Sequence, residues 1–149
     1  MQKNLFIGVM SGTSSDGLDI ALCKITPQNF TILNSISKKY SNRIKQDILK
    51  LNQSSFDDLE SSKAIGYQIS KICIPLISQL LDQKQLKSTD IQAIGFHGPT
   101  IRHQPNKNFS IQIGNEFTLA EKTNIPVVHD FRNMDIANGG QGAPLIPLF

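Results

Sequence analysis

The sequence lacks the features that identify several specialised classes of protein. Only two of its 149 residues are cysteines, Cys23 and Cys73, and each lies inside an apolar run. This placement favours two buried, reduced thiols over a disulfide framework. No basic-then-apolar leader opens the chain, and no apolar run approaches the length that spans a bilayer. These absences predict a cytoplasmic protein without a membrane segment.

An excess of charge of one sign is also missing. Fifteen Lys and Arg stand against twelve Asp and Glu, which leaves a formal net charge of +3. A nucleic-acid-binding face normally mixes clustered cations with aromatic residues, and no such stripe is present. The hydrophobic fraction of 39% and the charged fraction of 18% are typical of a globular protein, and the length suits one domain. We therefore expect a small-molecule ligand and no nucleic acid.

Three well-known signatures are absent as well. No glycine precedes a lysine, so there is no Walker A loop, and neither the dinucleotide-binding G-x-G-x-x-G nor the hydrolase G-x-S-x-G pattern occurs. Two histidines, His97 and His103, lie six residues apart, but no third ligand stands at a zinc-binding spacing. The commonest phosphate-binding, dinucleotide-binding and zinc-binding motifs are thereby excluded.

What the sequence does contain is an alternation of strand and helix patterns. Short apolar runs predict strands, and apolar residues at helical spacing predict helices. A capping box at Ser55 and Asp58 should start the longest helix, and Pro75 should kink it. The expected elements are strands over 5–10, 18–25 and 30–40, helices over 43–51 and from 55 through 81, a strand over 91–96, strands over 100–104 and 109–113, a helix over 115–123 and a strand over 125–128.

This order predicts a mixed α/β sheet that opens with an antiparallel three-strand meander. Such an opening is typical of the ribonuclease-H-like half of actin-type ATPases, in which the first hairpin holds nucleotide phosphates. Other α/β folds fit the same order of elements. The tail over 131–149 is rich in Gly and Pro and then apolar.

The first candidate site is the loop SGTSSDG at 11–17, between the first two strands. Glycines let the backbone approach a ligand, and successive N–H groups of such a loop can converge on an anion. Thr13, Ser14 and Ser15 add hydroxyl donors, and Asp16 could hold a hydrated Mg²⁺. The alternative is an ordinary hairpin loop, because Ser, Gly and Asp are common turn residues.

Two more polar clusters follow later strands. The segment GFHGPTIRH at 95–103 ends a buried strand, where α/β sheets place ligands, although it could be a simple strand-ending turn. In the segment 127–144, Asp130 lies just beyond a strand, and Arg132 and Asp135 carry opposite charges close together in the chain. These charges could hydrogen-bond sugar hydroxyls, or they could form a salt-bridged loop.

Four blocks together resemble the anhydro-N-acetylmuramic acid kinase family. They are GVMSGTSSDGLD at 8–19, GFHGPT followed by RH within 95–103, IQIG followed by LAE within 111–121, and DFR, Asp135 and GGQGAPL within 130–145. The blocks occur in order and cover essentially the whole chain.

The resemblance implies an actin-like ATPase fold and a reaction that uses ATP and Mg²⁺. In the family, water opens the 1,6-anhydro ring of anhydro-N-acetylmuramic acid and O6 is phosphorylated. The product, N-acetylmuramic acid 6-phosphate, feeds peptidoglycan recycling. By position, the ATP phosphate loop would be formed by Gly12, Thr13, Ser14, Ser15, Asp16, Gly17, Leu18 and Asp19. The amino sugar would contact Thr100, His103, Asp130, Arg132 and Asp135.

Three features depart from the family pattern. Met10 stands where many actin-like kinases have Asp, and Asp16 is the candidate for the missing carboxylate. Pro99 replaces a Gln near the expected sugar contacts. Family members are more than twice as long, and the aspartate that activates water would lie beyond Phe149. We therefore expect residues 1–149 to be the N-terminal lobe of such a kinase, weak or inactive without the second lobe. One alternative is a non-catalytic half-domain that binds nucleotide or sugar and acts with a partner chain. Another is a related actin-fold protein that takes a different sugar. The expected partner is the missing C-terminal lobe or a second copy of the chain.

Overall fold

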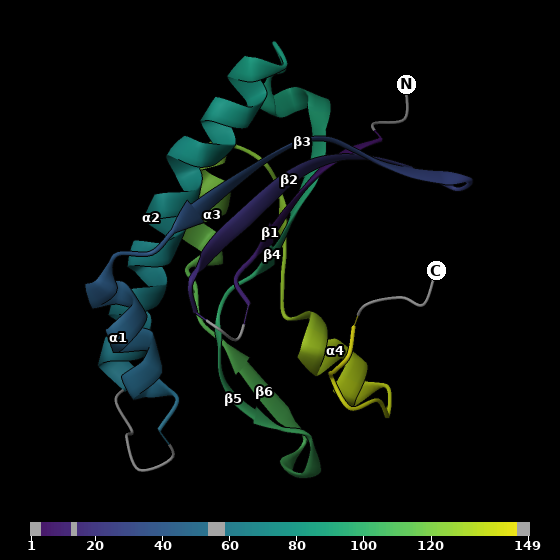
Figure 1. Cartoon of the computed structure of the whole chain (residues 1–149). Helices are drawn as coiled ribbons and strands as arrows, with labels where there is room; N and C mark the ends of the chain where they lie inside the picture. The colour runs from purple at the N-terminus through teal and green to yellow at the C-terminus, as the bar shows by residue number, and fades with distance from the viewer. Residues whose placement is uncertain (1–3, 13–14, 54–58, 146–149) are drawn as a thin grey trace.

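A five-stranded mixed sheet forms the centre of the computed structural model, which describes residues 4–12, 15–53 and 59–145 (Figure 1). The strands lie in the order β3-β2-β1-β4-β7. β2 is antiparallel to both β1 and β3, whereas β4 is parallel to both β1 and β7. The strands span Leu5–Met10 (β1), Gly17–Thr26 (β2), Asn29–Lys39 (β3), Ile91–His97 (β4) and Val127–Val128 (β7).

The mixed α/β class and the opening meander are therefore confirmed. β1, β2 and β3 are consecutive in the chain and adjacent in the sheet, as the short turns between their apolar runs predict. Burial then alternates along β1 and β2, because successive side chains of a strand point to opposite faces. Ile7, Val9, Ile20 and Leu22 are all buried on one face, and Met10 is exposed.

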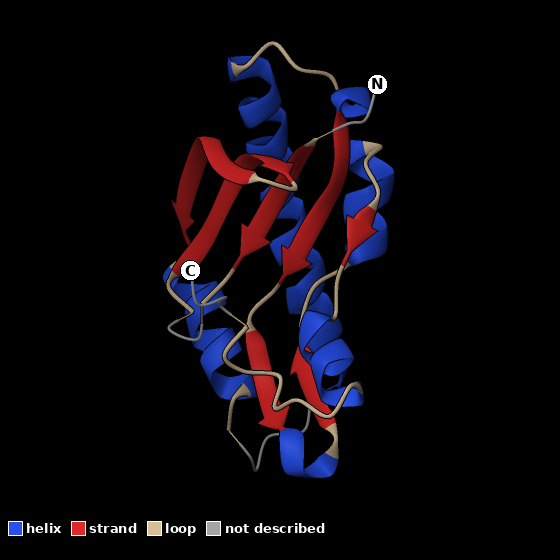
Figure 2. Cartoon of the chain, turned by 90° about the vertical axis from the view of Figure 1, so that its right-hand side faces the viewer, coloured by secondary structure: helices blue, strands red, loops and turns tan. Residues whose placement is uncertain are grey.

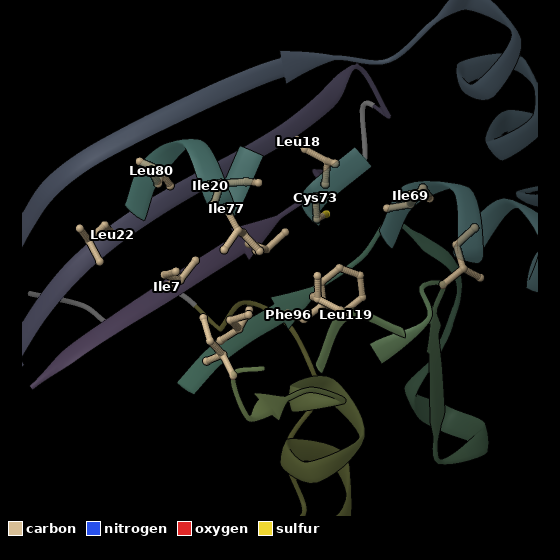
Figure 3. Packing of buried hydrophobic residues seen from close by; sticks show 14 of the residues in the cluster. Ile7, Leu18, Ile20, Leu22, Ile69, Cys73, Ile77, Leu80, Phe96 and Leu119 are labelled. Carbon is tan, nitrogen blue, oxygen red and sulfur yellow. The ribbon is translucent and has the colours of Figure 1, made fainter. Parts of the chain in front are cut away.

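The helices α1 (Asn42–Leu51), α2 (Leu59–Gln83) and α3 (Glu116–Thr123) lie together on the buried side of the sheet (Figure 1). Ile69, Cys73 and Ile77 of α2 pack in one cluster with the buried side chains of β1 and β2 (Figure 3). Seen with the strands in front, α2 runs behind the sheet, and within the described residues no helix covers the strands from the facing side (Figure 2). The sheet thus has one core face and one open face.

Side-chain caps explain where two of the helices begin. α1 starts after Ser41, whose hydroxyl accepts a hydrogen bond from the backbone N–H of Ile44 at 3.4 Å. α3 starts after Asn115, whose side chain accepts from the N–H of Thr118 at 2.8 Å. α2 is assigned as one unbroken helix through Pro75. The capping box expected at 55–58 lies outside the described residues.

The expectation that no segment is long and apolar enough to span a bilayer needs correction. α2 has 25 residues and a mean hydropathy of 1.2 over an 18-residue window, so by length and composition it could cross a bilayer. The sequence pattern predicts no such segment. The structure gives the helix another role, because Ile69, Cys73, Ile77 and Leu80 are at most 1% exposed within the protein core. A core helix meets the same length and composition criteria as a membrane span, and α2 is the central core helix of this domain.

A hairpin and a short helix extend from the carboxyl ends of the parallel strands (Figure 1). β5 (Thr100–Gln104) and β6 (Phe109–Gln112) pair with each other as a separate antiparallel sheet. α4 (Phe131–Ala137) follows β7, and the sequence pattern does not predict it. β7 has two residues in place of the predicted four. Pro126 precedes it and has no N–H to donate, although its carbonyl accepts from Ile94.

Candidate functional site

The loops that carry the sequence motifs meet at one edge of the sheet. β1, β4 and β7 are parallel, so their carboxyl ends share this edge, and β2 begins there because it is antiparallel to β1. The backbone N–H of Ser11, just after β1, donates to the carbonyl of His97 at the end of β4 at 3.0 Å. Ligands of open α/β sheets bind outside the carboxyl ends of the strands. This edge is the candidate site.

The glycine loop borders a cavity of about 380 Å³. Gly17 has to be glycine, because a Cβ there would lie 2.4 Å from the carbonyl oxygen of Lys38 on β3. The carboxylate of Asp16 pairs with the ammonium group of Lys45 on α1, and Oδ1 of Asp19 accepts from the Ser37 hydroxyl at 2.5 Å. The lining residues are Gly12, Asp16, Gly17, Leu18, Asp19, Ser37, Lys38 and Lys39. The cavity therefore brings the predicted loop together with two lysines of β3.

Two members of the predicted phosphate loop point inward. Ser15 is 1% exposed, and its Oγ has no hydrogen-bond partner among the described residues. Its φ of 53° is a left-handed conformation, which is uncommon for a residue other than glycine. The Leu18 side chain is buried in the core, so only its backbone could contact a ligand. Thr13 and Ser14 lie outside the described residues.

A buried hydrogen bond fixes the base of this loop. The hydroxyl of Tyr40 donates to Oγ of Ser11 at 3.1 Å, and the Tyr40 N–H donates to the carbonyl of Asp16 at 3.0 Å. Tyr40 therefore contacts the loop at both of its ends. Burial raises the pKa of Tyr40 well above its usual range, so the hydroxyl keeps its proton and remains a donor.

A second contact joins β4 to α4 beside this loop. Nε of Arg132 donates to Nε2 of His97 at 2.9 Å, and Nη1 of Arg132 donates to the carbonyl of Gly142 at 2.6 Å. Burial, and next the Arg132 charge, lower the pKa of His97, so the ring is neutral at pH 7. Arg132 and His97 line a cavity of about 590 Å³, together with Met10, Phe131, Ala143, Pro144 and Leu145.

The acidic residues around α4 have different partners from those that sequence spacing suggests. Within the described residues Arg132 forms no ion pair with Asp135. Oδ2 of Asp135 instead accepts from the backbone N–H of Gly142 at 2.8 Å. Asp130 has a left-handed φ of 65°, and its carboxylate accepts from Asn133 at 2.6 Å. Asp130 borders a polar cavity of about 250 Å³, whose charged or titratable members also include Lys63, Glu116 and His129.

Thr100 and His103 lie on the β5–β6 hairpin. Nδ1 of His103 is 3.1 Å from Oγ of Ser110, and Oγ1 of Thr100 accepts from the Gln112 side chain at 3.2 Å. Arg102, between them, donates to the carbonyls of Leu51 and Gln53 just at and beyond the end of α1. This arginine therefore fastens the hairpin to α1.

Thr100 and His103 lie on the hairpin and border none of the cavities described above. The other predicted site residues that the structure describes fall into three groups along one edge of the sheet. The glycine loop forms the first, Arg132 with the end of β4 the second, and Asp130 with the polar cavity the third. Sequence reasoning did not assign roles to His97, Tyr40, Lys45 or Asn133. The motif around 95–103 includes His97, but its partner lies 35 residues further along the chain. Only the packing of α4 against β4 brings the two together.

This arrangement defines the chain as a mixed α/β domain whose glycine loop and cationic side chains gather at the ends of parallel strands. The model of the family described as "Anhydro-N-acetylmuramic acid kinase" matches residues 4–149. The chain belongs to this family.

Three curated relatives carry the same description. The chain is 40% identical to the relative from Saccharophagus degradans over 154 residues, 45% identical to that from Pseudomonas fluorescens over 148, and 37% identical to that from Neisseria meningitidis serogroup C over 150. These alignments cover 100%, 97% and 100% of this chain, and 42%, 40% and 41% of the respective relatives. The chain therefore spans about two fifths of the length of the relatives it matches.

Proposed function

We propose that this chain is the nucleotide-binding N-terminal lobe of an ATP-dependent sugar kinase with an actin-like fold. The proposed reaction adds water to C1 of anhydro-N-acetylmuramic acid, breaks the C1–O6 bond and transfers the γ-phosphoryl group of ATP to O6. The products are N-acetylmuramic acid 6-phosphate and ADP, and the step belongs to peptidoglycan recycling. The observation that carries the proposal is the glycine loop between β1 and β2, at the carboxyl ends of the parallel strands, in a chain of this kinase family.

The strand order supports the actin-like assignment. Three antiparallel strands followed by two parallel ones, in the order β3-β2-β1-β4-β7, are expected for the ribonuclease-H-like lobe of that fold. In such a lobe the first hairpin, here β1–β2, contacts nucleotide phosphates. Its two strands are in register from Leu5 opposite Lys24 to Met10 opposite Asp19, so the loop starts and ends at one height.

The loop offers the groups that phosphate binding needs. Gly12 and Gly17 border the cavity without side chains, and Lys38 and Lys39 add positive charge at its rim. Asp16 and Asp19 line the same cavity, which suits a nucleotide-bound Mg²⁺, because that ion keeps several waters and needs only one or two carboxylates. Mg²⁺ would neutralise charge that develops on the phosphates. Lys45, which pairs with Asp16, would fix the orientation of this carboxylate.

The sugar would lie next to the loop, along the ends of β4 and β7. Arg132 is the cation at this position, and Asp130, Asp135, Thr100 and His103 are the other proposed contacts. The aspartate that activates water in the family would come from the second lobe. Free buried thiols at Cys23 and Cys73 suit the reducing cytoplasm, where ATP is available.

Nucleotide titration tests the loop assignment. Isothermal titration of the 149-residue chain with MgATP should give saturable binding, and Gly12→Val should abolish it by filling the space beside the phosphates. Gly8→Val is the matched control, because a Cβ at Gly8 has no atom within 4 Å. Equal binding by the wild type and Gly12→Val, or no binding by either, would refute a working phosphate loop.

A phosphorylation assay separates a kinase lobe from a binding half-domain. The isolated chain should transfer little or no phosphate from ATP to anhydro-N-acetylmuramic acid. Adding the complementary C-terminal three fifths of the Pseudomonas fluorescens relative should restore transfer if the two parts form one catalytic cleft. Full turnover by the isolated chain would contradict the division into lobes. Binding without any restored transfer would favour the non-catalytic half-domain.

A further inference from the structure

Arg132 is a cation without a counter-ion in the part of the chain that the structure describes. Among the described residues its guanidinium is bonded only to neutral acceptors, Nε2 of His97 and the carbonyl of Gly142, and it forms no ion pair. Asp135, one helical turn away, is occupied by the Gly142 N–H. A partly buried charge normally has an opposite charge beside it. The two neutral contacts fix the orientation of the side chain and leave its charge uncompensated.

Arg132 lines a cavity whose chemistry suits an anion. A guanidinium has five N–H donors, and two of them are used by His97 and Gly142. The cavity beside it holds about 590 Å³ and has apolar walls that include Met10, Phe131 and Pro144. Apolar side chains beside a charge displace part of the surrounding water and so strengthen the attraction between opposite charges. Arginine binds carboxylates and phosphates through paired hydrogen bonds, which require a fixed orientation.

We infer that His97 is the positioning residue that holds Arg132 ready to bind an anionic group of the ligand. The inference rests on the proposed function, which supplies two anionic sources, the carboxylate of the muramic acid and the phosphates of ATP. His97 accepts at Nε2, so the neutral ring carries its proton on Nδ1. A protonated His97 would have no acceptor left at Nε2, and it would repel Arg132.

The backbone of His97 is fixed at the sheet edge, beside the glycine loop. It lies at the end of β4, and its own carbonyl accepts from Ser11 at the start of the glycine loop. Nδ1 is buried and has no hydrogen-bond partner among the described residues. Among the described residues, the charged group in contact with the ring is Arg132, on α4. Asp19, on β2, lines the neighbouring cavity of about 520 Å³ with His97. The imidazole therefore links the anion-binding side chain to the sheet edge.

A first experiment reads the ring directly and does not depend on any ligand. Long-range ¹H–¹⁵N spectra of the 149-residue chain at pH 7 should show His97 as the Nδ1–H tautomer, with an unprotonated Nε2. Arg132→Gln should change these ring shifts, and an Nε2–H tautomer or a charged imidazolium would overturn the inference.

A second experiment identifies the anion. The probes are anhydro-N-acetylmuramic acid, its methyl ester, and MgATP, titrated into the wild type, His97→Leu and His97→Gln. If Arg132 binds the carboxylate, His97→Leu should weaken the acid about tenfold and leave the ester unchanged. If it binds a phosphate, MgATP should weaken instead. His97→Gln places an amide oxygen near the Nε2 position and should restore part of the affinity.

The outcomes that contradict the inference are equally defined. Tyr67→Phe is the control, because that exposed ring lies on α2 and lines none of the cavities described above. Changes below twofold for every probe in His97→Leu, or equal losses for acid and ester, would overturn the positioning role. So would the absence of any binding to the wild type. Failure of the proposed function is distinguishable, since it is read from Gly12→Val and the phosphoryl transfer assay.

Discussion

Removing the hydroxyl of Tyr40 tests whether the base of the glycine loop is held by a buried hydrogen bond. Tyr40 is 8% exposed and Ser11 is 1% exposed, and their oxygens are 3.1 Å apart. Tyr40→Phe keeps the ring and its packing but removes the donor. It also leaves Oγ of Ser11 without a partner among the described residues.

The structure sets the size of the expected effect. A net hydrogen bond contributes about 1 kcal/mol to stability, and an unsatisfied buried polar group costs about 1–3 kcal/mol. We therefore expect Tyr40→Phe to lower the free energy of unfolding by about 1–3 kcal/mol. Ser11→Ala should have a similar cost, and the double variant should lose less than the sum, because the second substitution removes the group stranded by the first.

Urea denaturation followed by circular dichroism measures these changes. Tyr67→Phe is the control, since Tyr67 is exposed on α2, and it should change stability by less than about 0.5 kcal/mol. MgATP affinity should fall in Tyr40→Phe if the same bond orders the loop. Wild-type stability in Tyr40→Phe, or strict additivity with Ser11→Ala, would refute the reasoning.

Three further predictions concern a turn, the thiols and pH. Gly98→Ala should lower the free energy of unfolding, measured in urea, by more than about 2 kcal/mol, because the new Cβ would lie 1.9 Å from a backbone oxygen just after β6. Gly8→Ala should be nearly neutral, and equal stability of the two variants would contradict this reasoning. Burial raises the pKa of Cys73 to about 12, so N-ethylmaleimide should label it quickly only in urea, and rapid labelling of the native chain would be the opposing result. Because the pKa of His97 is lowered on folding, its contribution to the free energy of unfolding is complete above about pH 6.5 and declines as pH falls. The free energy of unfolding of His97→Gln should therefore fall less steeply than that of the wild type between pH 7 and 5. Identical slopes would exclude this histidine as a cause.

The elements with strong local signals could be predicted from the sequence. β1, β2 and β3 follow apolar runs separated by turn residues, and α3 follows the side-chain cap of Asn115. α4 could not be predicted, because it has seven residues and Asp130, at its start, makes no capping hydrogen bond. Its position depends on tertiary contacts with β6 and with the loop at Gly142.

The candidate site was predictable in position but not in detail. Motifs at strand ends correctly point to one edge of the sheet, because parallel strands end together. The pairing of Arg132 with His97 depends on how α4 packs, and no pattern in the sequence fixes that distance. A salt-bridged loop is one of the two interpretations that the sequence leaves open for Arg132 and Asp135. Among the described residues these two do not pair, and the Asp135 carboxylate accepts from the Gly142 N–H instead. Spacing suggests which charges are close, but the loop backbone decides which of them pair.

Asn133 attaches α4 to the β5–β6 hairpin through two hydrogen bonds of the kind that a neighbouring strand makes. Its side-chain amide accepts from the N–H of Ser110 at 2.7 Å and donates to the carbonyl of the same residue at 2.8 Å, as a neighbouring backbone would. The Ser110 amide proton can therefore exchange with deuterium only when α4 detaches from the hairpin. The hydrogen-exchange rate of the Ser110 amide thus measures the free energy of that local opening. A ligand that holds Arg132 against the sheet edge would slow this exchange.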